Sequence, residues 1–375
     1  MSLFTARASV LQANRRTLAE RLHIDIPLLL CLLTLAVVSL FVLYSASGQN
    51  IDIIWRQAVR LGAAFFIMLL LAQVNSATLK RWTPWLFTLG IGLLLAVLLA
   101  GDTGKGAQRW LDLGLFRFQP SEMMKLAVPM MVAWYLSDHP LPPTLQRLAM
   151  ACLIIIAPTL LIAKQPDLGT ALLVASAGIF VLLFAGISWR LIFASSAALA
   201  ACAPVLWHFM HDYQRQRVLT FLNPEQNPLG AGYHIIQSKI AIGSGGLYGK
   251  GWLNGTQSQL NFLPERSTDF IFAAYAEEFG LFGILALLAV YLLVIMRGLL
   301  IASQAQDSFS RLLAGSLVMT FFIYLFVNIG MVTGLLPVVG VPLPLISYGG
   351  TSMVTLMAGF GILMSIHTHR KLLPR

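Results

Sequence analysis

The chain has 375 residues, of which 58% are hydrophobic and only 11% are charged. Soluble domains are closer to half apolar and a quarter charged, so this composition excludes both a soluble enzyme and a disordered chain. The formal net charge is +10. In a polytopic membrane protein such an excess is typical of cytoplasmic loops that contact anionic membrane lipid, and we expect no nucleic-acid partner.

Apolar runs follow one another along the whole sequence, and a helix that crosses a bilayer needs about 20 mostly apolar residues. The runs predict an all-α fold, a polytopic integral membrane protein with about ten transmembrane helices. No second domain or low-complexity tract interrupts them, so residues 1–375 form a single membrane domain. In chain order the runs are Ile26–Tyr44, Ala58–Val74, Pro84–Ala100, Ser121–Leu136, Leu148–Ala163, Leu168–Gly186, Leu191–Phe209, Phe270–Met296, Leu312–Thr333 and Thr351–His367.

Basic residues set the predicted orientation, because short cytoplasmic loops carry an excess of Lys and Arg. The short connections on one side are rich in Lys and Arg, whereas those on the other side hold only Lys105, Arg109 and Arg117. We therefore expect both termini in the cytoplasm, residues 1–23 at one end and 368–375 at the other. A large periplasmic loop, residues 210–269, then separates helices seven and eight.

Polar residues gather in the predicted outer connections, and the first cluster surrounds the start of the fourth helix. With the helix starting at Pro120 or Ser121, Glu122 and Lys125 stand three residues apart on one helical face. They form either a salt bridge at the membrane edge or the charged floor of an outward-facing cavity. Arg109, next to Trp110, is either an interface anchor or a phosphate ligand.

Two further outer clusters contain glycine. Asp167 precedes Gly169 in a tight turn, where aspartate is a common turn and cap residue. In the long outer loop, the stretch 233–242 has a partial apolar stripe, which suits a helix lying on the bilayer surface. The glycines that flank this stretch lack the spacing of a Walker or dinucleotide motif.

Asp269 is the most prominent acidic residue on the outer side. We expect it to open the eighth helix, with Thr268 as the N-cap. The field at a helix start favours an ionised carboxylate and suits a cation ligand, while partial burial acts in the opposite direction. The angular offset of Glu277 and Glu278 on the same helix argues against a carboxylate pair with Asp269. The residues thus indicate a charged outer cavity with one acid at its rim, which suits an amphiphile carrying phosphate.

Several motifs resemble those of the SEDS proteins (shape, elongation, division and sporulation), in order and over nearly the whole chain. Gly106–Gly114 and the triplet Pro264-Glu265-Arg266 favour the elongation branch of this family over its division branch. One residue departs from the family pattern: Ser267 stands where members commonly have histidine. The matching motifs are Gln108-Arg109-Trp110, Gln119-Pro120-Ser121-Glu122, Gln165–Thr170, Gly230–Gly246, Leu263–Phe270 and Ser347-Tyr348-Gly349-Gly350.

The resemblance implies a peptidoglycan glycosyltransferase. Such an enzyme polymerises lipid II on the outer face of the bacterial inner membrane during cell elongation and releases undecaprenyl pyrophosphate. It implies that Asp269 is the catalytic carboxylate, either as the base for the acceptor 4-hydroxyl or as a ligand of a divalent cation, Mg²⁺ or Mn²⁺. Expected substrate-binding residues are Arg109, Lys239 and Arg266 against the diphosphate, with Glu122, Lys125 and Glu265 shaping the cavity.

The resemblance also implies a partner, a single-span class B penicillin-binding protein that cross-links the new strands. Two other functions stay open, a lipid II flippase and a non-catalytic scaffold of the elongation machinery. A flippase needs access from both faces of the membrane, whereas the polar motifs here cluster outside and the cytoplasmic loops are short and basic. This asymmetry favours an enzyme, and a scaffold would predict that Asp269 is dispensable.

Overall fold

The computed structural model describes residues 22–104, 107–112, 117–202, 204, 207–208, 210, 212–223, 231–260, 262–263 and 265–369. Most of the two predicted cytoplasmic termini, 1–23 and 368–375, lies outside the described residues, as do Lys105 and Pro264. The fold is helical, as the composition predicts. Its helices are α3 (Ile26–Ala46), α4 (Ile51–Ala72), α5 (Ser76–Ala100), α6 (Pro120–Ser137), α7 (Leu145–Lys164), α8 (Leu168–Phe184), α9 (Trp189–Ala201), α11 (Asp212–Leu222), α12 (Ala231–Gly245), α13 (Thr256–Gln259), α14 (Ile271–Ser303), α15 (Ser308–Thr333) and α16 (Thr351–Thr368).

Each predicted apolar run corresponds to a helix in the structure. Among the described residues, 7 helices are long and apolar enough to cross a membrane, namely α3, α4, α5, α7, α14, α15 and α16. Helix α8 is apolar but shorter, with 17 residues, and α9 has 13, fewer than the predicted run Leu191–Phe209. That α6, α8 and α9 also span the membrane stays a prediction.

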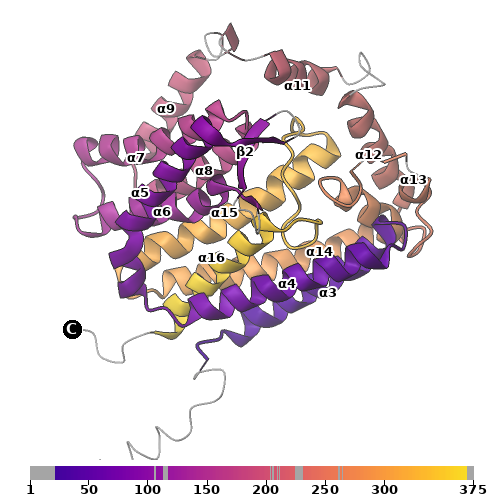
Figure 1. Ribbon diagram of the computed structural model, residues 1–375, viewed down its shortest axis with the longest axis horizontal. Coiled ribbons are helices and arrows are strands. Elements are labelled where there is room, and N and C mark those ends of the chain that lie inside the picture. The colour runs from indigo at the N-terminus through magenta and orange to yellow at the C-terminus, as the bar shows by residue number, and fades with distance from the viewer. Residues whose placement is uncertain are drawn as a thin grey trace, which may run out of the picture.

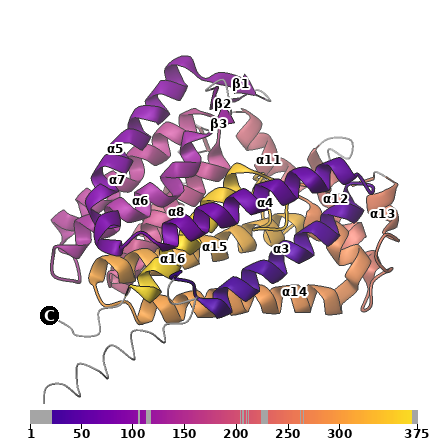
Figure 2. The ribbon, with the colours of Figure 1, turned by 60° about the horizontal axis from the view of Figure 1, so that its bottom comes forward.

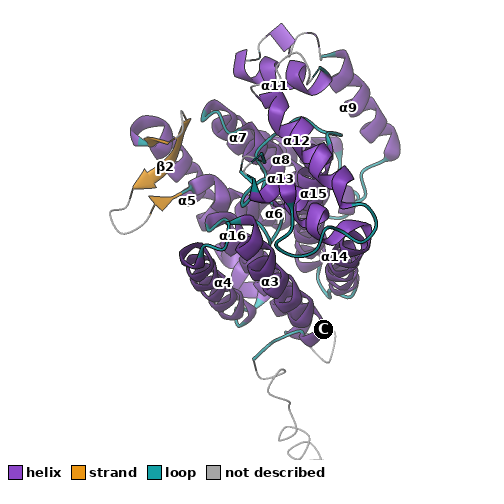
Figure 3. Ribbon diagram, turned by 90° about the vertical axis from the view of Figure 1, so that its right-hand side faces the viewer, coloured by secondary structure: helices purple, strands orange, loops and turns teal. Residues whose placement is uncertain are grey.

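A small antiparallel sheet, which the sequence did not predict, fills the connection between α5 and α6. Its strands are β1 (Asp102–Gly104), β2 (Ala107–Asp112) and β3 (Arg117–Phe118), in the order β1-β2-β3. Figure 3 shows the sheet at one end of α5. Strand β2 contacts both α5 and α6, so it carries Arg109 close to the start of α6.

Helix α15 is the centre of the bundle (Figure 1), in contact with α6, α8, α12, α14 and α16. It begins behind the N-cap Asp307, whose side chain accepts from the Ser310 N–H at 2.8 Å. It ends at Gly334, which has the left-handed conformation (φ 75°) that favours glycine at a helix C-terminus. On the far side of the bundle α3, α4 and α14 run side by side (Figure 2), and α3 contacts both of the others.

Helix α14 is interrupted at Gly280, whose φ of 64° and ψ of −164° are not helical. The carbonyls of Glu277 and Glu278 accept from the backbone N–H groups of Lys250 and Gly251, each at 3.0 Å. Because the loop after α12 supplies these donors, the two carbonyls are hydrogen-bonded although the helix is interrupted. The loop of residues 246–251 is therefore fixed to the first part of α14.

Helix α12 contains the stretch that we expected on the bilayer surface, and one face of it packs on protein; that the helix also lies on the bilayer surface stays a prediction. Helix α12 packs on α14 and α15, with Ile235 and Ala241 buried. The Ser238 hydroxyl, also buried, donates to the Val332 carbonyl at 2.8 Å. The buried face of this helix is thus covered by protein rather than by lipid.

Candidate functional site

Asp269 lies in a turn of residues 265–270 that precedes α14, and not in the helix itself. Helix α14 begins at Ile271 with Phe270 as its N-cap. The Thr268 hydroxyl does not cap the helix, because the N-cap is Phe270 and no side chain accepts from the first turn. The hydroxyl donates instead to Glu265 O at 3.1 Å and to Glu265 Oε2 at 2.8 Å. The expectation that Asp269 opens the helix is therefore wrong. Asp269 directly precedes the N-cap Phe270, so the residue still stands beside the positive end of α14.

Three consecutive carbonyls of this turn are held by α15 and by the chain that follows it. We call residues 334–350, between α15 and α16, the α15–α16 connection. The donors are Tyr348 N–H to Ser267 O at 2.8 Å, Ser347 Oγ to Thr268 O at 2.6 Å and Asn328 Nδ2 to Asp269 O at 2.9 Å. The backbone that carries the Asp269 carboxylate is thus anchored residue by residue.

The α15–α16 connection also borders the carboxylate of Asp269, which is partly buried. A methyl group on Gly340 would lie 3.5 Å from Asp269 Oδ2, and Gly340 has a φ of 81° that favours glycine. On the other side of the connection, a methyl group on Gly169 would lie 2.9 Å from Val339 Cγ1. The start of α8 and the Asp269 turn therefore contact the same short segment.

Asp167, at the start of α8, receives the side chain of Arg109. As the N-cap of α8, its carboxylate accepts from the Thr170 N–H at 3.3 Å and from Gln119 Nε2 at 3.1 Å. Arg109 Nε lies 3.8 Å from Asp167 Oδ2, and the guanidinium also donates to the Pro166 carbonyl. Arg109 is therefore held above the start of α8, and about a third of its side chain (34%) is exposed.

Glu122 and Lys125 form the salt bridge that their spacing predicted. Lys125 Nζ lies 2.7 Å from Glu122 Oε1, and the two side chains are 5% and 9% exposed. The ammonium also lies 5.1 Å from the centroid of the Tyr324 ring on α15. Lys125 lines a small, mainly apolar cavity between α6, α15 and α16. The pair is thus both a buried ion pair and part of a cavity wall.

Lys239 and Arg266 belong to the segment between α9 and α14, which contains the loop predicted to lie outside. Lys239 is exposed on α12, and its side chain packs so closely on Gly334 that a methyl group there would collide with it. Arg266 is half-buried beside Gly48, and burial lowers the pKa of its guanidinium. Within the described part of the chain its Nη1 atom has no hydrogen-bond acceptor. Glu265, the other predicted residue of this turn, is exposed.

The structure therefore arranges the predicted residues around the α15–α16 connection. Lys239 contacts its first residue, Gly334, and Asp269 lies against Gly340. Arg109 contacts Asp167 at the start of α8, which borders the connection. Lys125, paired with Glu122, lies against the Tyr324 ring, and Tyr324 packs with Val341 of the connection. The connection itself was recognised in the sequence only by the motif at Ser347.

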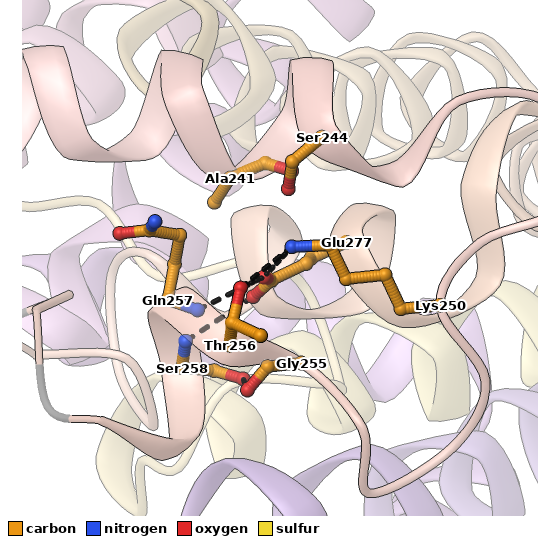
Figure 4. A network of polar contacts seen from close by, with 8 residues as sticks. All are labelled: Ala241, Ser244, Lys250, Gly255, Thr256, Gln257, Ser258 and Glu277. Atoms are coloured by element: carbon orange, nitrogen blue, oxygen red, sulfur yellow. Dashed lines mark hydrogen bonds and ion pairs between the residues drawn. The ribbon is translucent and has the colours of Figure 1, made fainter.

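Glu277 and Glu278 do not pair with Asp269, as their angular offset predicted. Glu277 points toward α13, where it accepts from Lys250 Nζ at 2.7 Å and from the Ser258 N–H at 3.1 Å (Figure 4). Glu278 is buried and accepts a hydrogen bond from Ser45 of α3. Both carboxylates therefore have structural partners away from Asp269.

A divalent cation would find few protein ligands at this site. Within the described residues, no group of three or more His, Cys, Asp and Glu side chains could hold a metal ion. Asp269 could supply one carboxylate, and Mg²⁺ is often bound by one or two carboxylates together with substrate phosphates and water. A cation that bound here together with the substrate would need only this one carboxylate from the chain.

Sequence reasoning missed Asn328 and Gly340, the two residues that meet Asp269 from α15 and from the connection. Asn328 is a fully buried amide inside an apolar helix. Such a polar residue in a predicted span is a signal of function or of a specific hydrogen bond, and it could have been followed. Gly340 carries no comparable signal in the sequence.

The fold and the site together define a polytopic membrane protein whose polar motifs surround one aspartate. A sequence model of the FtsW, RodA and SpoVE family, described as "Cell cycle protein", matches residues 22–372. The chain belongs to this family, which confirms the resemblance to SEDS proteins.

Individual members of the family resemble the chain over nearly its whole length. It is 58% identical over 363 residues to the peptidoglycan glycosyltransferase MrdB of Escherichia coli K12, covering 96% of this chain and 98% of that relative. A solved chain of a peptidoglycan synthase complex that coordinates polymerization and crosslinking has a TM-score of 0.81 and 32% identity, covering 93% of this chain and 98% of that chain. The rod shape determining protein RodA of Thermus thermophilus has a TM-score of 0.70 and 28% identity, covering 92% and 98%.

Proposed function

We propose that this chain polymerises lipid II into glycan strands on the outer face of the bacterial inner membrane and releases undecaprenyl pyrophosphate. The enzyme class is that of its relatives, peptidoglycan glycosyl transfer. The observation that carries the proposal is the Asp269 turn. Three hydrogen bonds fix the backbone of residues 267–269, and the Asp269 carboxylate lies next to Gly340.

In the proposed step, the Asp269 carboxylate accepts the proton of the 4-hydroxyl of the acceptor N-acetylglucosamine. The oxygen attacks the anomeric carbon of the donor sugar from the face opposite the diphosphate. The new glycosidic C–O bond forms as the bond between that carbon and the diphosphate oxygen breaks, with inversion. The electron pair leaves on undecaprenyl pyrophosphate, and the proton stays on Asp269 until solvent removes it. A general base of this kind contributes about 10²- to 10⁴-fold.

Cationic side chains stabilise the leaving diphosphate in this proposal. Arg266 and Arg109 each have a guanidinium nitrogen without a hydrogen-bond acceptor in the described structure, and a guanidinium fork suits phosphate oxygens. Lys239 is exposed on α12, with its ammonium beside Gly334. Glu122 orients Lys125 at the edge of the site. In the alternative role, Asp269 would hold Mg²⁺ or Mn²⁺ against the diphosphate instead of acting as the base, and the cation would supply further charge neutralisation.

The lipid part of the substrate also finds a suitable surface. The cavity between α6, α15 and α16 is lined mainly by apolar side chains, among them Leu317, Phe321 and Phe360. Lys125 lies at the same cavity, so a phosphate and a hydrocarbon chain could bind close together. This arrangement supports an amphiphilic phosphate ester as substrate.

A partner completes the proposed function. We expect a class B penicillin-binding protein to cross-link the strands that this chain makes. The similarity to a chain of a synthase complex that couples polymerization to crosslinking supports this partner. The same relatives support a bacterial inner-membrane location and a role in cell elongation.

The test uses the purified chain, with and without its penicillin-binding partner, incubated with labelled lipid II and Mg²⁺ or Mn²⁺. We expect a ladder of glycan strands on a gel. A well-folded complex that forms no ladder, but moves labelled lipid II across a vesicle bilayer, would overturn the proposal in favour of a flippase.

A further inference from the structure

We propose that Asn328 is a positioning residue that sets the place of the Asp269 carboxylate in the site. The inference rests on the proposed role of Asp269 in glycosyl transfer. Asn328 lies on α15 with no exposed surface. Its Nδ2 atom donates to the carbonyl of Asp269 at 2.9 Å and to the carbonyl of Val341 at 2.7 Å. One side chain thus joins the turn that carries the acid to the connection that borders it.

The chemistry of the side chain is specific for this contact. A primary amide has two N–H donors, and here each serves one backbone carbonyl. An aspartate of the same shape would place a carboxylate against two carbonyl oxygens, and an apolar side chain would leave both carbonyls without a donor in a dry interior. An asparagine here therefore does what neither its isostere nor an apolar residue can do.

The two carbonyls belong to the two segments that meet at the acid. The Val341 carbonyl follows Gly340, which borders Asp269 Oδ2, while the Asp269 carbonyl belongs to the acid's own backbone. The amide of Asn328 therefore fixes the spacing between the carboxylate and the segment against which it lies. A general base must stand within hydrogen-bond reach of the proton that it removes, so this spacing bears directly on the rate.

Ser347 forms a second link of the same kind. Its hydroxyl donates to the Thr268 carbonyl at 2.6 Å and accepts from the Leu343 N–H at 2.8 Å. It thus joins the α15–α16 connection to the residue next to Asp269. If Asn328 and Ser347 hold the acid in place together, the Ser347→Ala variant should show a milder form of the Asn328 defect.

The matched control is Ser316, on the same helix. Ser316 is also fully buried, and its hydroxyl donates to the Ala177 carbonyl of α8 at 2.6 Å. It joins two helices by a buried hydrogen bond but does not contact the Asp269 turn. A general effect of losing a buried hydrogen bond in α15 would therefore appear equally in Ser316→Ala and in the Asn328 variants.

The experiment measures initial rates of lipid II polymerisation by the complex of the full chain and its penicillin-binding partner. The variants are Asn328→Asp, Asn328→Leu, Ser347→Ala, Ser316→Ala and Asp269→Ala, each checked for folding by size-exclusion chromatography and thermal unfolding. Because a displacement of about 1 Å can cost about 100-fold in rate, we expect kcat of Asn328→Asp to fall about 10- to 100-fold. KM for lipid II should stay within about twofold, since the Asn328 amide donates to the carbonyls of Asp269 and Val341 and not to a proposed substrate-binding side chain.

Each outcome bears on the proposal. Ser316→Ala should keep kcat within about twofold even where its unfolding temperature falls, because it does not touch the acid. Folded Asn328 and Ser347 variants with wild-type kcat, or with losses matching Ser316→Ala, would overturn the inference while leaving the function intact. Polymerisation by Asp269→Ala would remove the proposed role of Asp269 and this inference with it.

Discussion

Lys250 Nζ lies 2.7 Å from Oε1 of Glu277, a carboxylate with no exposed surface on α14. The same carboxylate accepts from the Thr256 hydroxyl at 3.1 Å and from the N–H groups of Gln257 and Ser258 at 2.9 and 3.1 Å (Figure 4). Since α14 follows the Asp269 turn directly, this cluster fastens the outer loop to the same helix that begins at the site.

Replacing Lys250 by Met should destabilise the protein by about 2 kcal/mol, because a buried carboxylate loses a charged hydrogen-bond donor. The control is Lys80→Met, which breaks an ion pair with Asp138 of similar length, 2.6 Å, but with side chains 33% and 57% exposed. Exposed pairs contribute less than about 1 kcal/mol. Chemical unfolding in detergent would measure both variants. Equal losses would contradict the special role of the buried cluster.

Variants of the buried Glu122–Lys125 pair distinguish the two roles that the sequence left open, a salt bridge and the charged floor of a cavity. Glu122→Gln leaves the Lys125 ammonium without its counter-ion and should cost about 3–5 kcal/mol of stability. The double variant Glu122→Gln, Lys125→Met removes both charges and should recover most of that loss. If the pair also serves the substrate, the double variant stays inactive in the lipid II assay although it is stable. Recovery of both stability and activity would reduce the pair to a structural salt bridge.

Local patterns predicted the parts of the fold that depend on near neighbours in sequence. The apolar run Thr351–His367 anticipated α16 to within a residue, and the three-residue spacing anticipated the Glu122–Lys125 contact. The run Phe270–Met296 ended too early, because α14 continues through Arg297. Arg297 pairs with the buried Asp25 at 2.6 Å, and a distant partner of this kind is invisible to a hydropathy window.

The features of the site that the sequence did not predict also depend on partners that are distant in sequence. Asn328 and Asp269 are 59 residues apart in sequence, and Lys250 and Glu277 are 27 apart. Asp269 itself was placed in a helix because the apolar run begins beside it. The turn of residues 265–270 depends instead on the Thr268–Glu265 contact and on donors from the α15–α16 connection. A local contact and tertiary hydrogen bonds together hold the turn from which that helix starts.

His234 gives a pH dependence with a defined sign. Its ring stacks on Phe270 with centroids 5.6 Å apart, and its Nδ1 atom lacks a hydrogen-bond partner among the described residues. Burial lowers the pKa of His234 below its ordinary value of 6.5, although the Glu265 carboxylate acts in the opposite direction. The histidine is therefore neutral in the folded protein at neutral pH.

Above pH 6.5 this histidine is neutral in both states, so its contribution to stability is constant. As the pH falls below that value, the unfolded chain binds the proton first, and stability drops by at most about 1.4 kcal/mol per pH unit. The drop ends at the lowered pKa of the folded state. Thermal unfolding between about pH 7.5 and 5.5 should show a smaller loss for His234→Phe, which keeps the stacked ring. An identical loss in both proteins would refute the assignment.

The most direct test of the account concerns Asp269. Purified wild-type complex, Asp269→Ala and the exposed-site control Asp138→Ala would be incubated with labelled lipid II, and their products resolved on a gel. The account predicts glycan ladders from the wild type and from Asp138→Ala, and none from an Asp269→Ala protein that elutes and unfolds like the wild type. Ladders of wild-type length and rate from Asp269→Ala would contradict it.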